Sequence, residues 1–137
     1  MSSIRRSSGF LLIDNNKKFI LQHRDGNIKR LPNYWAFFGG KIEKRETPKM
    51  SVRREAKEEL GIKLKNLKFV QSYESKTRNE IQFIFIAPLT ISLEKLRKQQ
   101  EEGQGLKLFS LKMTENLKTP SFEKAILKDL FKRGLIA

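Results

Sequence analysis

Alternating apolar and polar positions predict several short β-strands along the chain. The strand-like runs are residues 9–13, 19–21, 34–38, 67–70, 81–86 and 106–111. Turn-forming polar residues at 14–18 separate the first two runs, and the polar segment 74–80 separates the fourth and fifth. Because short polar turns join antiparallel neighbours, each of these pairs predicts a β-hairpin.

Two segments have helical character. Thr47 offers an N-cap hydroxyl, Pro48 suits the first helical position and Gly61 suits a left-handed stop, so one helix of about three to four turns is predicted between them. Residues 122–131 repeat apolar positions at helical spacing and predict a second helix. The charged run 94–102 fits either a helical turn or a long loop. Strands therefore outnumber helices, and the pattern predicts an α+β fold.

Composition narrows the class of protein. The 137 residues fit one domain, 1–137, and contain no cysteine and no apolar run of membrane-spanning length. We therefore expect a cytoplasmic protein without a membrane partner. The net charge of +14 predicts attraction of anions such as nucleotides or RNA, although a lysine-rich solvated surface also explains it.

Five of the 15 acidic residues nevertheless fall between positions 43 and 59. Glu55, Glu58 and Glu59 are related as i, i+3 and i+4, so they share one face of the predicted helix. Three like charges at this spacing repel one another, and the repulsion can be offset by a neighbouring cation such as Arg54 or by a divalent metal ion. Carboxylate oxygens favour Mg²⁺, with Mn²⁺ as a substitute. The adjacent stripe that would dock on the sheet is Val52, Ala56 and Leu60.

The spacing of the whole segment is more specific than the carboxylates alone. Five residues separate Gly40 from Glu46, and seven more separate Glu46 from Arg54. The segment continues as Glu55, Ala56, Lys57, Glu58, Glu59, Leu60, Gly61 and Ile62. It resembles the Nudix signature at every specified position, and the whole chain is similar to MutT-type nucleoside triphosphate pyrophosphohydrolases. The resemblance implies a Nudix fold, an α/β/α sandwich around a mixed β-sheet.

The resemblance also implies roles for residues of the signature. Glu55, Glu58 and Glu59 would face Mg²⁺, with Glu55 and Glu59 as direct ligands and the Gly39 carbonyl as a further one. Arg54 would orient Glu55. The residues that would shape the motif without touching substrate are Gly40, Glu46 and Gly61.

Outside the signature, the resemblance points to Glu102 in the segment Glu102-Gly103-Gln104 as a metal ligand or general base, with Glu101 as the alternative register. The choice of base between Glu102 and Glu55 stays open. Arg24 is a candidate phosphate contact. Phe122 falls where an asparagine reads the purine in the oxidised-guanine subgroup, and a phenyl ring lacks the amide's donor and acceptor.

The resemblance implies Mg²⁺-dependent cleavage of a nucleoside triphosphate to monophosphate and pyrophosphate. Two alternatives are enzymatic: removal of pyrophosphate from the 5′ end of RNA, and hydrolysis of dinucleoside polyphosphates. A third is a non-catalytic Nudix-like sensor that binds nucleotide or RNA, although the intact signature argues against it. A homodimer is expected because Nudix proteins often form dimers.

Overall fold

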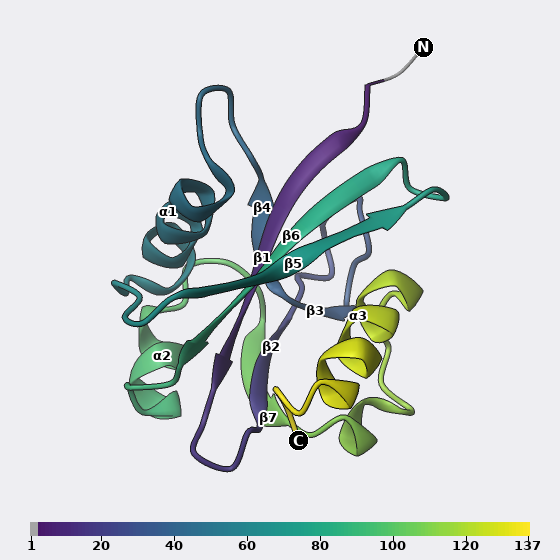
Figure 1. Ribbon diagram of the computed structural model, residues 1–137. Coiled ribbons are helices and arrows are strands. Elements are labelled where there is room, and N and C mark those ends of the chain that lie inside the picture. Colours follow the sequence, from purple (N-terminus) through teal and green to yellow (C-terminus); the bar gives the residue numbers. More distant parts are fainter. Residues whose placement is uncertain (1–2) are drawn as a thin grey trace.

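The computed structural model describes residues 3–137, and its central feature is a mixed β-sheet with helices on both faces (Figure 1). The strands are β1 (Arg5–Ile13), β2 (Phe19–His23), β3 (Trp35–Ala36), β4 (Phe38–Lys41), β5 (Lys68–Ser75), β6 (Glu80–Pro88) and β7 (Gly105–Phe109). The helices are α1 (Pro48–Leu60), α2 (Leu93–Gln99), α3 (Ser121–Lys132) and the 3₁₀ turn η1 (Lys112–Thr114). This architecture confirms the predicted α+β class and the sandwich around a mixed sheet.

Strand β1 organises the sheet. It runs parallel to β6 along its whole length and antiparallel to β4 and β2 on its other side. Strand β5 pairs with β6, and β7 pairs with β2, both antiparallel. Strand β4 lies beside the first half of β1 and leads through a short loop to α1. Its glycines, Gly39 and Gly40, therefore lie next to the helix that bears the glutamates.

Each face of the sheet has its own core. Helices α1 and α2 cover one face, where the predicted stripe of Val52, Ala56 and Leu60 is fully buried. Helix α3 covers the other face and inserts Ile126, Leu127 and Leu130. Figure 1 shows α1 and α3 on opposite sides of the strands. Because β-strand side chains alternate between faces, neighbouring residues of β1 serve different cores.

Helix α1 begins and ends where local chemistry predicts. The Thr47 hydroxyl accepts a hydrogen bond from the Met50 amide at 3.1 Å, and Pro48 occupies the first turn. Gly61 terminates the helix with φ of 64°, in the left-handed region. These three residues fix the helix, and hence its carboxylates, relative to β4.

Some boundaries differ from the prediction. The aromatic run 34–38 forms two strands. Strand β3 pairs with β2 and ends before Phe37, whereas β4 starts at Phe38 and pairs with β1. The second hairpin has a shorter turn than 74–80, since β5 extends to Ser75 and β6 starts at Glu80. The charged run after residue 92 contains helix α2, whose N-terminus is capped by the Ser92 hydroxyl. Across residues 3–137, no helix is both long and apolar enough to cross a bilayer.

Candidate active site

The three glutamates of α1 share a face but have different environments. The Glu59 side chain is buried, with 2% of the residue exposed, where α1 packs against the sheet. The Glu55 side chain is 13% exposed, whereas that of Glu58 is 57% exposed. The solvent exposure of the carboxylates therefore increases across this face of the helix, from Glu59 through Glu55 to Glu58.

Arg54 connects the helix to the preceding loop. Its guanidinium donates two hydrogen bonds to the Glu46 carboxylate, at 2.7 and 2.9 Å, in a bidentate arrangement. It also donates to Glu55 at 3.0 Å and to Glu58 at 3.2 Å. One cation thus offsets part of the repulsion among the glutamates and holds Glu55 in place.

The two glycines of β4 lie where a side chain would collide with a neighbouring element, β1 at Gly39 and α1 at Gly40. The Gly39 amide donates a hydrogen bond to Glu59 Oε2 at 3.1 Å. Gly39 has φ of 137°, and a Cβ there would lie 2.1 Å from the Ser8 carbonyl oxygen. A Cβ on Gly40 would lie 2.7 Å from Glu55 Oε1. A side chain at Gly39 would therefore collide with the backbone of β1, and one at Gly40 would push the Glu55 carboxylate away from the strand.

Burial makes Glu59 a weak acid in the metal-free protein. Desolvation, followed by the negative charges of Glu55 and Glu102, raises the pKa of Glu59 to about 9 despite the Gly39 hydrogen bond. Burial also raises the pKa of Glu55, although Arg54 opposes the shift. A nearby cation is the ordinary way to keep such carboxylates ionised.

The loop between α2 and β7 carries Glu102 to this place. The Glu101 amide donates to the Glu59 carbonyl oxygen at 2.8 Å, and the Gly103 amide donates to Asp25 Oδ2 at 3.3 Å. Glu102, Glu59 and Gly39 line a common hollow of about 490 Å³. The late glutamate predicted from the sequence therefore reaches the signature helix in space.

The donor set of this hollow suits a hard divalent cation. Glu59 and Glu102 supply carboxylate oxygens, the buried Glu59 needs a positive partner, and Glu55 stands within electrostatic reach. In residues 3–137, however, no three acidic or histidine side chains converge closely enough to hold an ion as they stand. Metal binding would therefore require the carboxylates to draw together.

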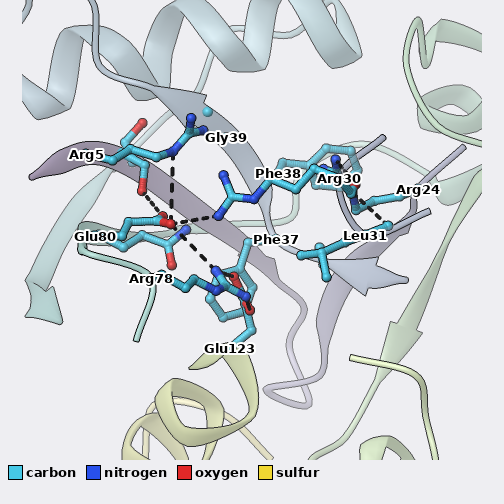
Figure 2. A pocket seen from close by; sticks show the side chains of 15 residues that line it. Arg5, Arg24, Arg30, Leu31, Phe37, Phe38, Gly39, Arg78, Glu80 and Glu123 are labelled. Atoms are coloured by element: carbon cyan, nitrogen blue, oxygen red, sulfur yellow. Dashed lines mark hydrogen bonds and ion pairs between the residues drawn. The ribbon is translucent and has the colours of Figure 1, made fainter. Parts of the chain in front are cut away.

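A second, smaller cavity adjoins the first and has a volume of about 120 Å³. Arg24, Arg30 and Gly39 line both. Figure 2 shows arginines converging on two carboxylates in this cavity. Arg30 donates to Glu80 at 2.8 Å, and Arg78 donates two hydrogen bonds to Glu123, at 3.0 and 2.9 Å. We call this feature the arginine cavity.

Two predicted substrate contacts lie in different places. Arg24 lines both hollows, and its guanidinium donates to the carbonyl oxygens of Leu31 and Arg30. Phe122 is outside the arginine cavity: its ring packs under the Arg78 guanidinium, 5.3 Å from the centroid, and borders an open hollow with Tyr34.

The sequence predicted Arg24, Gly39 and Gly40 as site residues, but most of the other polar residues that line the arginine cavity were missed. Glu80 and Gln82 are both buried and point to the same face of β6 as the core residue Ile84. Polar residues at alternate positions of an otherwise apolar strand were a readable signal of this cavity. The pairing of Arg78 with Glu123, 45 residues apart, left no comparable signal.

Comparison with a family model decides the classification. Residues 3–130 match the model of the NUDIX domain. The chain belongs to the Nudix family. YtkD from Bacillus subtilis (strain 168), whose name provisionally assigns it as an 8-oxo-dGTP diphosphatase, is 34% identical over 99 residues. That match covers 69% of this Nudix chain and 60% of YtkD, so it spans less than two thirds of the relative's length.

Solved structures support the same fold. A MutT protein from Methanosarcina mazei Go1 superposes with a TM-score of 0.78 at 21% identity, covering 97% of this Nudix chain and 96% of that protein. The NUDIX domain of Shewanella oneidensis NrtR, solved with ADP ribose, has a TM-score of 0.73 at 12% identity, with coverage of 97% and 90%. At these identities the likeness concerns the fold alone.

Proposed function

We propose that this Nudix protein is a metal-dependent pyrophosphohydrolase that cleaves a nucleoside triphosphate to the monophosphate and pyrophosphate, with residues 1–137 acting as one domain. The observation that carries the proposal is the hollow in which the buried Glu59 faces Glu102 beside Gly39. This hollow adjoins the arginine cavity and shares lining residues with it. The arrangement supports a substrate that has both an anionic phosphate chain and a second polar group. The name of YtkD supports a nucleoside triphosphate as the substrate.

Mg²⁺ is the metal we propose, held by Glu59, Glu55 and Glu102 with the Gly39 carbonyl, and Mn²⁺ is its substitute. When bound, it would neutralise the negative charge of the phosphates and so favour attack by water. Glu58 is exposed at the rim of the carboxylate face and would complete the set only after turning from Arg54.

The protein's own groups would orient the reactants. Arg24 and Arg30 line the passage between the hollows, where their positive charge would bind the phosphate chain. Glu102 or Glu55 would accept a proton from the attacking water. Arg54 would hold Glu55 in position, and its bidentate pair with Glu46 would anchor the loop before α1. Such positioning accounts for most of the catalysis in phosphoryl transfer.

RNA with a 5′-triphosphate is the second candidate substrate. An open hollow of about 730 Å³, bordered by Tyr34 and Phe122, lies next to the arginine cavity and shares Leu31 and Arg78 with it. Aromatic side chains in this position could stack a further base. The net charge of +14 also favours a longer anionic substrate.

A substrate panel with variants tests the proposal. Wild type, Glu59→Gln and the exposed control Glu94→Gln would be incubated with nucleoside triphosphates, dinucleoside polyphosphates and 5′-triphosphorylated RNA, with Mg²⁺ or EDTA. We expect turnover of nucleoside triphosphates by wild type and Glu94→Gln, and loss in Glu59→Gln or EDTA. If wild type binds these ligands yet releases no product with Mg²⁺ or Mn²⁺, the protein is a sensor and the proposal fails.

A further inference from the structure

Main-chain hydrogen bonds fasten both ends of the loop that carries Glu102. On one side the Glu101 amide donates to the Glu59 carbonyl oxygen at 2.8 Å, and on the other the Gln104 amide donates to the His23 carbonyl oxygen at 2.7 Å. Glu102 lies between these anchors and is exposed. Its place in the hollow beside Glu59 therefore depends on what holds the middle of the loop.

A side chain holds the middle of this loop. The Gly103 amide, next to Glu102 in the chain, donates a hydrogen bond to Asp25 Oδ2 at 3.3 Å. Asp25 lines the same hollow as Glu102. In residues 3–137 the Asp25 carboxylate forms no ion pair, so the Gly103 amide does not compete with a cation for it.

The conformation of Gly103 keeps its amide close to this acceptor. Its φ of 89° lies in the left-handed region, and a Cβ there would lie 2.9 Å from the His23 carbonyl oxygen and 3.2 Å from Gln22 Oε1. The loop thus lies directly on the end of β2, with no room for a side chain. Because Asp25 comes two residues after the end of β2, the strand that supports the loop also leads to its acceptor.

Main-chain hydrogen bonds hold Asp25 in place as well. The Asn33 amide donates to the Asp25 carbonyl oxygen at 3.2 Å, and the Arg24 amide donates to the Tyr34 carbonyl oxygen at 2.8 Å. These bonds continue the pairing of β2 with β3 beyond the ends of both strands. The Asp25 carboxylate is therefore attached to the sheet, whereas Glu102 is attached to a loop.

We infer that Asp25 is a positioning residue: by accepting the Gly103 hydrogen bond, it sets the place of the neighbouring Glu102 carboxylate beside Glu59. The inference rests on the proposed function, because it takes Glu102 as part of the metal site. In this role Asp25 acts through its oxygen atom and not through its charge, and on Glu102 and not on the metal ion. Removing a group that orients a metal ligand typically lowers metal affinity or activity by about 10–100-fold.

Two substitutions at Asp25 separate the oxygen atom from the charge. Asparagine keeps a carbonyl oxygen in the same place and removes the charge, whereas alanine removes both. Mn²⁺ affinity would be measured by electron paramagnetic resonance, without nucleotide, for wild type, Asp25→Asn, Asp25→Ala and the exposed control Glu94→Gln. We expect Asp25→Ala to bind Mn²⁺ about tenfold more weakly than wild type, and Asp25→Asn and Glu94→Gln to stay within about threefold of it.

A double-mutant cycle shows whether Asp25 acts through Glu102. Glu102→Gln alone should lower the affinity for Mn²⁺, and adding Asp25→Ala should lower it no further, because the carboxylate that Asp25 positions is already gone. Losses that multiply in the double variant would mean that Asp25 acts on the metal by itself, and would overturn the inference. An equal loss of affinity in Asp25→Asn and Asp25→Ala would overturn it as well, since the charge would then be what matters.

Amide hydrogen exchange measures the contact without metal or turnover. In EDTA, the Gly103 amide should exchange at about the wild-type rate in Asp25→Asn and at least about tenfold faster in Asp25→Ala. An unchanged exchange rate in Asp25→Ala would remove the contact on which the inference depends.

These results are separable from the hydrolase assay. A wild type without turnover whose Mn²⁺ affinity follows the expected cycle would keep the inference and remove only the proposed reaction. Turnover by a protein in which the two losses multiply would leave the hydrolase standing and remove the inference. A wild type that does not bind Mn²⁺ would overturn both.

Discussion

Glu59 concentrates the chemistry of the site in one residue. Its carboxylate is buried between α1 and β4, accepts a hydrogen bond from the Gly39 amide and faces two other carboxylates. A side chain placed in this way destabilises the fold when no cation is present, because the buried carboxyl, with its pKa of about 9, must take up a proton on folding near neutral pH. The same placement makes it a strong ligand once a cation is present.

Replacing Glu59 by glutamine should therefore have opposite effects on stability and on metal binding. In EDTA, Glu59→Gln should raise the free energy of unfolding by about 1 kcal/mol or more, since the buried acid is removed. Its affinity for Mn²⁺ should fall at least about tenfold. Urea unfolding and Mn²⁺ titration by electron paramagnetic resonance measure the two effects, with Glu94→Gln as the exposed control. A loss of stability in EDTA would contradict this account of Glu59.

Glu80 predicts a specific pH dependence of stability. Burial acts to raise the pKa of Glu80, but hydrogen bonds from Ser7 and Arg30 and the charge of Arg78 outweigh it, so the net pKa is below its ordinary value of 4.5. The folded state thus binds the proton less well than the unfolded state. The stabilisation is complete above pH 4.5 and is lost as the pH falls through the folded-state pKa.

The measurement is urea unfolding of wild type and Glu80→Gln from pH 7 to pH 3. At neutral pH the variant should be less stable by about 1–3 kcal/mol, because Arg30 loses its charged partner. The difference should shrink on acidification. A difference that stays constant or grows at low pH would show that the Glu80 carboxylate is not stabilised as described.

At the scale of elements, the contact of β4 with α1 builds the site. Both glycines of β4 lie where a side chain would meet another group, but the groups differ. At Gly39 the obstacle is the backbone of β1, which cannot move without breaking the sheet. At Gly40 the obstacle is the end of the Glu55 side chain, which can rotate away.

Alanine substitutions should separate these two cases. Gly39→Ala should destabilise the protein by about 3 kcal/mol or more, since it adds a backbone clash to a positive φ. Gly40→Ala should change the unfolding temperature little but lower turnover at least about tenfold, because it displaces Glu55. Thermal unfolding and hydrolysis rates of both variants provide the check. Equal destabilisation by the two substitutions would argue against the described difference in their surroundings.

Elements with local signals were predictable from the sequence. Helix α1 has its cap, its proline and its terminal glycine within one segment, and both hairpins have polar turns between apolar runs. The break at Phe37 was not predictable, because it depends on the pairing of β4 with β1, which lies far away in the sequence. Likewise, α2 is a short helix whose charged surface gives little periodicity to read.

The residues of the site also divide into those that have a local sequence signal and those that do not. The glutamates of α1, Arg54 and the glycines follow from spacing within one segment. The arginine cavity joins residues from β1, the loop after β2, β6 and α3. The polar positions of β6 give a sequence signal, but only the folded chain shows which residues complete the cavity. The hydrogen bonds of the loop around Glu102 to Glu59 and Asp25 are also products of the tertiary structure.

For the whole molecule, the excess of positive charge bears on the length of the substrate. A free nucleotide presents few phosphates, whereas RNA would contact many lysines and arginines and release more counterions. Turnover of a nucleoside triphosphate should therefore change little between 50 and 200 mM KCl. Affinity for 5′-triphosphorylated RNA should fall about 10³-fold or more over the same range if six or more phosphates are contacted.

Steady-state rates for the nucleotide and fluorescence anisotropy for the RNA measure these dependences. Strong RNA affinity that persists at 200 mM salt, together with weak turnover of free nucleotides, would reverse the order of the two candidate substrates.

The most direct test of the central claim is the identity of the products. Phosphorus NMR of inosine or guanosine triphosphate incubated with the protein and Mg²⁺ distinguishes cleavage between the α and β phosphates from loss of the terminal phosphate. We expect monophosphate and pyrophosphate in equal amounts, and no reaction in EDTA. Diphosphate and inorganic phosphate, or an unchanged spectrum with Mg²⁺ and with Mn²⁺, would contradict this claim.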